Sequence, residues 1–492
     1  MKNMNNMNNQ KNKLINSLKR SVCLLLSSSM FLVSAGCSPN ADLNASNASS
    51  SSSQTQTQAN AEKAVTVNLM DEIQSSANST SDSPSEKDQT MDALFQDSVI
   101  DFSVRLFQQV FSEDFSKESS SDQESASSNI MISPLSVLTA LSMTLNGAEG
   151  DTQDQMLAVL FSDYVDAKTG SDTVSLEEIN KNISILLSGL PSSQQARFLQ
   201  ANSIWFRGSD SSDESKLYDF QVNPDFLQTN ADYYNAELFQ APFNDETLTD
   251  INNWCSEHTE KMIPQLLDEI PPNAVMYLIN ALAFDAVWES TYQDYQIFDS
   301  EFTNADETSS TVSMMCSEEH RYLQMEHAAG FIKPYAENYS FAALLPDENT
   351  SLADLVANLS GEQLINILSQ ASEEDVTVQI PQFTSEYSTD LAEVFQTMDM
   401  DLPFDAEKAD FRGITVTAKQ AESLSISRIL HKTYISVNEK GTQAAAATAV
   451  ELAKESCNVD IKQVILNRPF IYFIIDQSTN LPIFMGTVTQ LP

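Results

Sequence analysis

Hydrophobic side chains recur every three to four positions over residues 97–111, and this spacing predicts a helix. An amphipathic helix is expected over 97–111, with one face formed by Val99, Phe102, Leu106 and Val110. The segment 130–145 is apolar almost throughout and has Pro134 near its start, where proline suits the first turn of a buried helix. Between them, the Ser-, Glu- and Asp-rich stretch 112–128 predicts a solvated loop.

Further along, the pattern changes to short apolar runs that are typical of strands. These runs are 201–206, 375–383, 470–475 and 483–488, and the last two are joined by a polar turn. The segment 389–398 has helical spacing instead. Since no internal repeat or obvious linker interrupts 91–492, the sequence predicts one mixed α+β domain there.

The first 37 residues have the pattern of an export signal. A positively charged stretch, 11–20, precedes an apolar run over 22–33, which predicts a signal peptide over 1–36. This run is shorter than the ~20 apolar residues that a membrane span needs. Ser34-Ala35-Gly36-Cys37 resembles the lipobox of bacterial lipoproteins and predicts a lipid on Cys37; the alternative is ordinary cleavage near Ala35 that leaves Cys37 free.

Residues 37–90 are rich in Ser, Asn, Gln, Thr and Ala and contain few side chains that could form a core. This composition predicts a flexible linker between the lipid and the domain. We therefore expect a secreted, extracellular protein that is anchored through Cys37 to the outer face of the bacterial cell membrane.

Acidic residues dominate the domain. The chain has 26 Lys and Arg against 69 Asp and Glu, a formal net charge of −43. Seven of each sign lie in 1–90, so 91–492 holds 19 basic and 62 acidic residues. Such a field repels nucleic acid and anionic lipid and attracts basic partners, although acidity for solubility is the simpler explanation.

Catalytic and metal-binding motifs are not found in the sequence. The chain has only 11 Gly, and no G-x-S-x-G, G-x-G-x-x-G or Walker-type motif occurs. None of the 4 His belongs to an H-E-x-x-H motif. We expect neither an enzyme nor a metal or cofactor site. Cys255, Cys316 and Cys457 remain beside a lipidated Cys37, and this odd number predicts at least one free thiol.

Four groups of motifs, spread over 97–492, resemble the serpin family of protease inhibitors. They are Asn129 to Ser136 with Leu145 to Thr152, Asn253-Trp254 with Asn280 to Phe284 and Trp288, Ala409 to Ile414, and Asn467 to Phe470 with Phe484-Met485-Gly486. Each motif alone is weak evidence for the family, but all four in this order along the chain are specific for it. Three positions where the family has glycine are occupied by Lys261, Ala286 and Asp399.

The resemblance implies the α+β serpin fold, with three β-sheets, about nine helices, an exposed reactive-centre loop and a metastable native state. It also implies a breach at Trp288 and a polar shutter under the main sheet, formed by Ser133, Ser136, Asn280 and His431. Since a buried network of this kind has to be satisfied in every state of the sheet, it can gate the opening of the sheet.

The segment 439–455 matches the hinge of inhibitory serpins, and its hinge residues are Glu439, Lys440, Gly441, Thr442, Ala444, Ala445, Ala446 and Ala447. After cleavage this segment has to enter the main sheet as a central strand, which favours small side chains. With Thr442 facing inward, a period of two residues places Val450 and Leu452 on the core face. Gln443 and Glu451 then lie on the outer face.

The usual hinge length of the family, counted from Gly441, places the reactive bond at Glu455–Ser456. Cleavage there suits a glutamate-preferring protease. Cleavage after Lys454 would suit a trypsin-like protease, and cleavage after Ala453 or Val450 an elastase-like one.

The resemblance therefore implies a monomeric suicide-substrate inhibitor of a serine or cysteine protease, which it traps as a covalent acyl complex. The alternative is a non-inhibitory serpin that acts as a surface binding or structural module. The small hinge residues argue against this alternative, because a bulky or charged residue there would block insertion.

Overall fold

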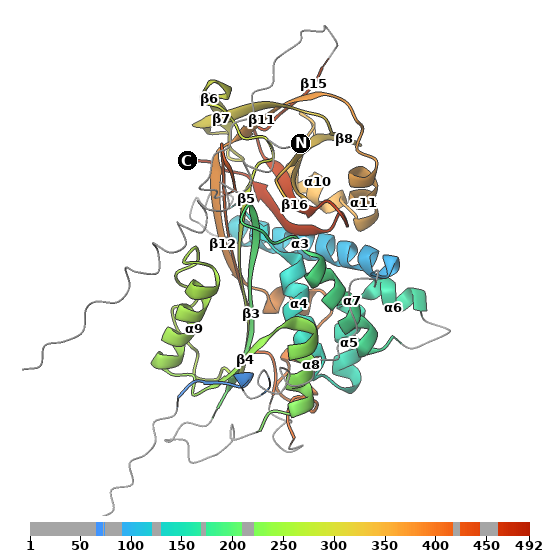
Figure 1. Cartoon of the computed structure of the whole chain (residues 1–492), viewed down its shortest axis with the longest axis vertical. Helices are drawn as coiled ribbons and strands as arrows, with labels where there is room; N and C mark the ends of the chain where they lie inside the picture. The colour runs from blue at the N-terminus through green and yellow to red at the C-terminus, as the bar shows by residue number, and fades with distance from the viewer. Residues whose placement is uncertain are drawn as a thin grey trace, which may run out of the picture. The chain divides into compact units, whose positions relative to one another are not determined.

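The computed structural model describes residues 65–71, 73, 91–120, 129–168, 174–208, 221–416, 424–442 and 461–492. In these segments, ten α-helices and two short 3-10 helices pack against three β-sheets (Figure 1). No helix in these segments is both long enough and apolar enough to cross a membrane.

The helices fall into two groups along the chain. The helices before β5 are α3 (Ala93–Ser120), α4 (Pro134–Leu145), α5 (Gly150–Leu160), α6 (Ser162–Lys168), α7 (Leu176–Gly189), α8 (Pro224–Tyr234) and α9 (Asp245–His258). The later ones are η2 (Asp294–Gln296), α10 (Leu352–Asn358), α11 (Gly361–Ser369), α12 (Ala392–Thr397) and η3 (Leu402–Phe404).

The strands form three sheets, which we call A, B and C. In spatial order, sheet A contains β1 (Val67–Asn68), β4 (Glu237–Ala241), β3 (Ala196–Arg207), β5 (Met276–Val287), β14 (Gly441–Thr442), β13 (Arg428–Asn438) and β12 (Phe383–Asp390). Sheet B contains β2 (Met131–Ile132), β17 (Pro482–Val488), β16 (Phe470–Asp476), β10 (Tyr339–Pro346), β9 (Ala328–Pro334) and β8 (Tyr322–Met325). Sheet C contains β15 (Lys462–Ile465), β11 (Val376–Pro381), β7 (Ser309–Glu319) and β6 (Ile297–Thr303).

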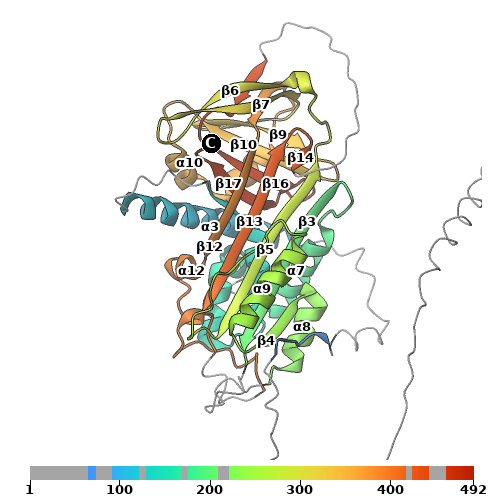
Figure 2. The same cartoon turned by 90° about the vertical axis from the view of Figure 1, so that its left-hand side faces the viewer.

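Sheet A lies between two layers, with α9 on one face and α4, α5, α7 and α8 on the other (Figures 1 and 2). The main core includes α4, whose residues are all buried. It also includes β10, β16 and β17 of sheet B, which are buried along their whole length. Continuous apolar strands of this kind are expected where both faces of a sheet are covered.

The helix α9 packs on the outer face of sheet A over a second, smaller core that includes Trp205, Trp254, Ile279 and Leu430. The side chain of Asn244 caps α9 by accepting hydrogen bonds from the N–H groups of Glu246 and Thr247, each at 3.0 Å. After α9 the chain continues across the sheet, and Lys432 Nζ of β13 donates to the carbonyl of Gln265 at 2.8 Å.

Two segments differ from the sequence-based expectation. The helix α3 continues to Ser120, although 112–128 predicts a loop. A tertiary contact accounts for part of this extension, because Tyr387 Oη donates to Asp114 Oδ2 at 2.9 Å.

The second difference concerns the predicted linker, 37–90. Within it, β1 pairs with the edge strand β4, and the Leu69 N–H donates to the Leu238 carbonyl at 2.8 Å. Met70 is fully buried in the main core. The folded domain therefore includes residues that precede the predicted boundary at 91, because a neighbouring strand edge supplies the pairing that the local sequence lacks.

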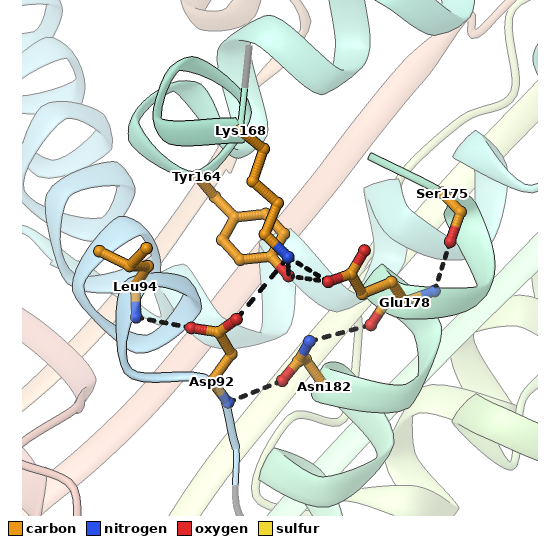
Figure 3. A network of polar contacts seen from close by, with 7 residues as sticks. All are labelled: Asp92, Leu94, Tyr164, Lys168, Ser175, Glu178 and Asn182. Atoms are coloured by element: carbon orange, nitrogen blue, oxygen red, sulfur yellow. Dashed lines mark hydrogen bonds and ion pairs between the residues drawn. The ribbon is translucent and has the colours of Figure 1, made fainter. Parts of the chain in front are cut away.

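A polar network holds the first residues of α3 against α6 and α7 (Figure 3). Lys168 Nζ contacts Glu178 Oε1 closely and lies 3.8 Å from Asp92 Oδ2. Tyr164 Oη donates to the same Glu178 oxygen at 2.7 Å, and Asn182 Oδ1 accepts from the Asp92 N–H at 3.0 Å. Burial is the main cause that raises the pKa of Tyr164 to about 12, so its phenol stays protonated and can donate. The network fixes the start of α3 against α6 and α7.

Candidate functional site

The site begins where the predicted hinge meets sheet A. After β13 the chain reverses, and β14 inserts its two residues between β5 and β13. Thr442 pairs with Ala286 of β5 on one side and with Val437 of β13 on the other. Figure 2 shows β5, β13 and β12 side by side.

Below β14, β5 and β13 pair directly and in parallel, from Tyr277 opposite Arg428 to Ala283 opposite Tyr434. We call this direct contact the seam. Any strand that continued from β14 into sheet A would have to separate the two partners along the seam. The structure therefore shows a sheet that is closed except at the end where β14 enters.

Gly441 is required at this entry by its close approach to β5. Its φ is +149°, and a Cβ built there would lie 2.0 Å from the carbonyl oxygen of Ala286. A side chain at 441 would push β14 away from β5, which explains the predicted glycine in this hinge.

Thr442 faces the interior and is fully buried. Its Oγ1 lies 2.6 Å from Tyr335 Oη, in a hydrogen bond between two buried hydroxyls. The Tyr335 ring stacks on Trp288, with centroids 4.1 Å apart and planes 6° apart. The indole N–H of Trp288 donates to the Asn438 carbonyl at 2.8 Å, so the breach tryptophan connects the base of the hinge with the core beneath Thr442.

The reversal itself is held by hydrogen bonds to the chain after β5. The backbone N–H groups of Trp288 and Tyr292 donate to the carbonyls of Lys440 and Glu439, each at 2.9 Å. The Glu439 carboxylate accepts from Gln382 Nε2 at 3.0 Å. Every residue from Glu439 to Thr442 therefore has a defined partner in or beside sheet A.

A buried ion pair lies beside Trp288 and Tyr292, the two residues whose N–H groups hold the hinge. Lys333 Nζ lies 2.7 Å from Glu319 Oε1, and its side chain is only 2% exposed. The ammonium also lies 5.3 Å from the Trp288 ring centroid and 4.6 Å from that of Tyr292, within range of cation–π attraction. Burial and, secondarily, the nearby Glu319 charge raise the pKa of Tyr292 well above its usual value, which keeps this phenol neutral.

The predicted shutter lies in the middle of the seam, on the inner face. His431 and Asn280 are direct partners across it, and the His431 Nδ1–H donates to Asn280 Oδ1 at 2.5 Å. His431 Nε2 accepts from the backbone N–H of Ser133 at 3.1 Å. These two contacts fix the tautomer with the proton on Nδ1.

Asn280 extends the network to β3. Its Nδ2 donates to Asn202 Oδ1 at 2.5 Å and makes a short contact with Ser136 Oγ. Ser136 Oγ in turn donates to Asn202 Oδ1 at 2.9 Å and accepts from Gln200 Nε2 at 3.1 Å. Opening the seam between His431 and Asn280 would leave several of these buried groups without partners, at a cost of about 1–3 kcal/mol for each group.

Ser133 joins the shutter in a different way from that expected. Its hydroxyl has no hydrogen-bond partner among the described residues, whereas its backbone N–H contacts His431. The sequence identified Ser133, Ser136, Asn280 and His431 but missed Asn202. A polar residue near the start of the apolar run 201–206, in register with Asn280, is the signal that points to it.

The shutter makes stability depend on pH. Burial lowers the pKa of His431 to about 3, whereas the unfolded chain titrates near 6.5. As the pH falls below 6.5, the unfolded state binds a proton that the folded state excludes, so stability decreases towards pH 3. Between pH 6.5 and pH 5 the loss is about 2 kcal/mol.

We expect the thermal midpoint of the wild type to fall from pH 7 to pH 5 more steeply than that of His431→Gln, as measured by differential scanning calorimetry. His320→Gln is the matched control, because the His320 side chain is 80% exposed, and it should keep the wild-type slope. Equal slopes for the wild type and His431→Gln would contradict this role of His431.

Other predicted residues lie outside the described segments. They are the hinge alanines 444–447, the candidate reactive positions Val450, Ala453, Lys454, Glu455 and Ser456, the thiol of Cys457, and Cys37. Cys255 is a free thiol, and burial raises its pKa to about 12. Cys255 is therefore protonated and unreactive at neutral pH.

Two of the three positions where the resemblance expects glycine have a backbone conformation that favours glycine. Lys261 has φ +68° and Asp399 has φ +67°, both in the left-handed region. The replacements therefore leave these two turns intact at the cost of local strain.

Comparisons with known proteins agree with this geometry. The family model described as "Serpin (serine protease inhibitor)" matches residues 98–491. Human antithrombin-III is 30% identical over 378 residues, which cover 75% of this chain and 78% of that protein. Human serpin B8 is 30% identical over 380 residues, which cover 74% of this chain and 93% of that protein.

Among solved structures, the thermophilic serpin tengpin in its native state is 39% identical, with a TM-score of 0.74, and the match covers 87% of this chain and all of that one. The same serpin in its latent state gives 38% identity and a TM-score of 0.66. The chain belongs to the serpin family, and its three sheets are those of the serpin fold.

Proposed function

We propose that this protein inhibits a serine protease outside the cell by acting as a suicide substrate. The observation that carries the proposal is the entry of β14 into sheet A. Gly441 and Thr442 already occupy the first positions of a new strand, with pairing to both β5 and β13. After Gln443, the small residues 444–447 follow in the sequence and suit further insertion.

The proposed mechanism uses the nucleophile of the protease. Its serine attacks the carbonyl of Glu455, the bond to Ser456 breaks, and the new amine leaves with a proton from the protease. An ester then joins the two proteins. If the freed hinge enters the seam before water cleaves the ester, the protease is carried along and its catalytic geometry is distorted, so the ester persists.

The test is to mix the purified protein with glutamate-preferring, trypsin-like and elastase-like proteases and to analyse the products on a denaturing gel. We expect a covalent complex with at least one of them. The mass of the released peptide gives its first residue, which we expect to be Ser456. Cleavage by every protease without any complex would contradict inhibition and would favour the non-inhibitory serpin.

We also propose that a lipid on Cys37 holds the inhibitor on the outer face of the cell membrane. The lipobox-like sequence Ser34 to Cys37 and the polar segment that follows it support this location. Membrane fractionation tests it, because Cys37→Ala should move the protein to the soluble fraction. An unchanged membrane fraction would contradict the anchor.

A further inference from the structure

The helix α9 and the chain that follows it lie on the outer face of sheet A (Figure 2). Asn252 of α9 joins the two, because its Nδ2 donates to the Leu267 carbonyl at 2.9 Å and its Oδ1 accepts from the Leu266 N–H at 2.8 Å. We call α9 together with residues 259–267 the strap. The second core lies between the strap and strands on both sides of the seam, and it includes Ile251, Trp254, Ile263 and Leu267 of the strap with Ile279 of β5 and Leu430 of β13.

Polar contacts also tie the strap to both sides of the seam. On the β13 side, Lys432 Nζ donates to the Gln265 carbonyl at 2.8 Å. On the β5 side, Glu260 Oε1 accepts from Arg197 Nη1 of β3 at 2.5 Å, and Arg197 also pairs with Asp285 of β5. A strand inserted into the seam would move β5 and β13 apart by about 4.8 Å. The seam can therefore widen by a full strand only if the ties on one side are released.

A further tie joins the C-terminal end of α9 to β4, on the β5 side of the seam. His258 Nε2 lies 3.2 Å from Glu237 Oε2, and His258 Nδ1 lies 2.8 Å from the Trp254 carbonyl oxygen. Carboxylate and carbonyl oxygens only accept hydrogen bonds, so both ring nitrogens have to carry a proton to make these two contacts. The complete tie therefore requires a charged His258.

Aromatic rings hold this pair in position. The His258 ring lies against the Trp254 indole, with centroids 4.5 Å apart, and the indole N–H contacts the same Glu237 carboxylate. Trp254 packs edge-on against Phe239 of β4, and Phe239 stacks on Trp205 of β3 with centroids 4.2 Å apart. The pair His258–Glu237 is thus fixed to two neighbouring strands of sheet A.

The surroundings of His258 favour its charged form and still allow it to exchange protons with solvent. Its side chain is 37% exposed, whereas His431 is fully buried. The hydrogen bond to Glu237 is the main cause that raises the pKa of His258, and partial burial opposes it. Among the described residues, the charged groups that act on the ring are Glu237 of β4 and Glu257 of α9. The tie is therefore complete at acidic pH and is lost as the pH rises through this raised pKa.

We propose that the pair His258–Glu237 is a charge-dependent latch on the strap, which slows opening of the seam as long as His258 carries its second proton. Loss of this proton removes the ion pair between α9 and β4 and leaves the strap less firmly tied on the β5 side. Resting on the proposed function, the cleaved loop then inserts faster, so a larger share of the protease is trapped at alkaline than at acidic pH.

Hydrogen exchange followed by mass spectrometry measures opening of the seam without any protease. The measured quantity is the protection factor of the backbone N–H groups in 428–434, taken as the ratio of wild type to His258→Gln at the same pH. In this ratio the intrinsic effect of pH and any contribution of His431 cancel, because both proteins share them. We expect a ratio of about three or more at pH 6 and of about one at pH 8.5.

Three further variants test the role of the charge. Glu237→Gln should lose as much protection at pH 6 as His258→Gln. His258→Arg, which stays charged, should keep the wild-type protection at pH 6 and exceed it at pH 8.5. The matched control is His320→Gln, which replaces a histidine that is 80% exposed and lies outside the strap, and it should keep the wild-type protection at both pH values.

A ratio of wild type to His258→Gln that is the same at both pH values, or that equals one at pH 6, would overturn the latch. The share of trapped against cleaved product with a trypsin-like protease, read from denaturing gels at the same two pH values, reports separately on inhibition. A protein that is cleaved but never trapped would contradict the proposed function, while the protection factors would still decide whether the latch controls the seam.

Discussion

Thr442→Arg is expected to convert the protein from an inhibitor into a substrate. Thr442 is fully buried between β5 and β13, and its hydroxyl lies 2.6 Å from Tyr335 Oη. An arginine there would either bury an unpaired charge or keep the hinge out of the sheet. Insertion would then be slower than hydrolysis of the acyl ester, and the protease would be released.

The measurement is the stoichiometry of inhibition together with the yield of covalent complex on a denaturing gel. We expect no complex from Thr442→Arg and complete cleavage of the loop. Gln443→Arg is the matched control, because the period of two residues places position 443 on the outer face, and it should keep most of the complex. Equal complex yields from Thr442→Arg and the wild type would show that insertion does not start at this position.

The spacing of apolar residues predicts the strands that are buried along their whole length. The apolar run 470–475 corresponds to β16 and the run 483–488 to β17, because both strands are buried throughout. The run 201–206 covers only the last part of β3, which begins at Ala196. Its first residues include half-buried polar side chains that take their strand conformation from pairing with β5.

The elements that the sequence missed depend on distant parts of the chain. The two residues of β1 are a strand only because β4 offers a free edge. The hinge residues Glu439 to Thr442 could be identified from the local sequence and the family resemblance. Their partners Tyr335 and Gln382 could not, because they lie just beyond the ends of β9 and β11, far along the chain, and no local pattern links them to residue 439.

Cleavage of the loop should also increase the stability of the whole domain. In the described part of the intact protein, β14 reaches Thr442, and β5 and β13 pair directly below it. After cleavage, the residues beyond 442 could form ladder hydrogen bonds with both neighbours and bury Val450 and Leu452, each worth about 2 kcal/mol. In a domain of about 400 residues, several kcal/mol of added stability correspond to a rise in thermal midpoint of about 5 °C.

The central claim is that the reactive loop inserts into sheet A along the seam between β5 and β13. The most direct test is differential scanning calorimetry of the intact protein and of protein nicked within residues 450–458, at the same pH. Insertion predicts a higher midpoint for the nicked form by about 5 °C or more. An equal or lower midpoint after nicking would contradict insertion and, with it, the proposed mechanism of inhibition.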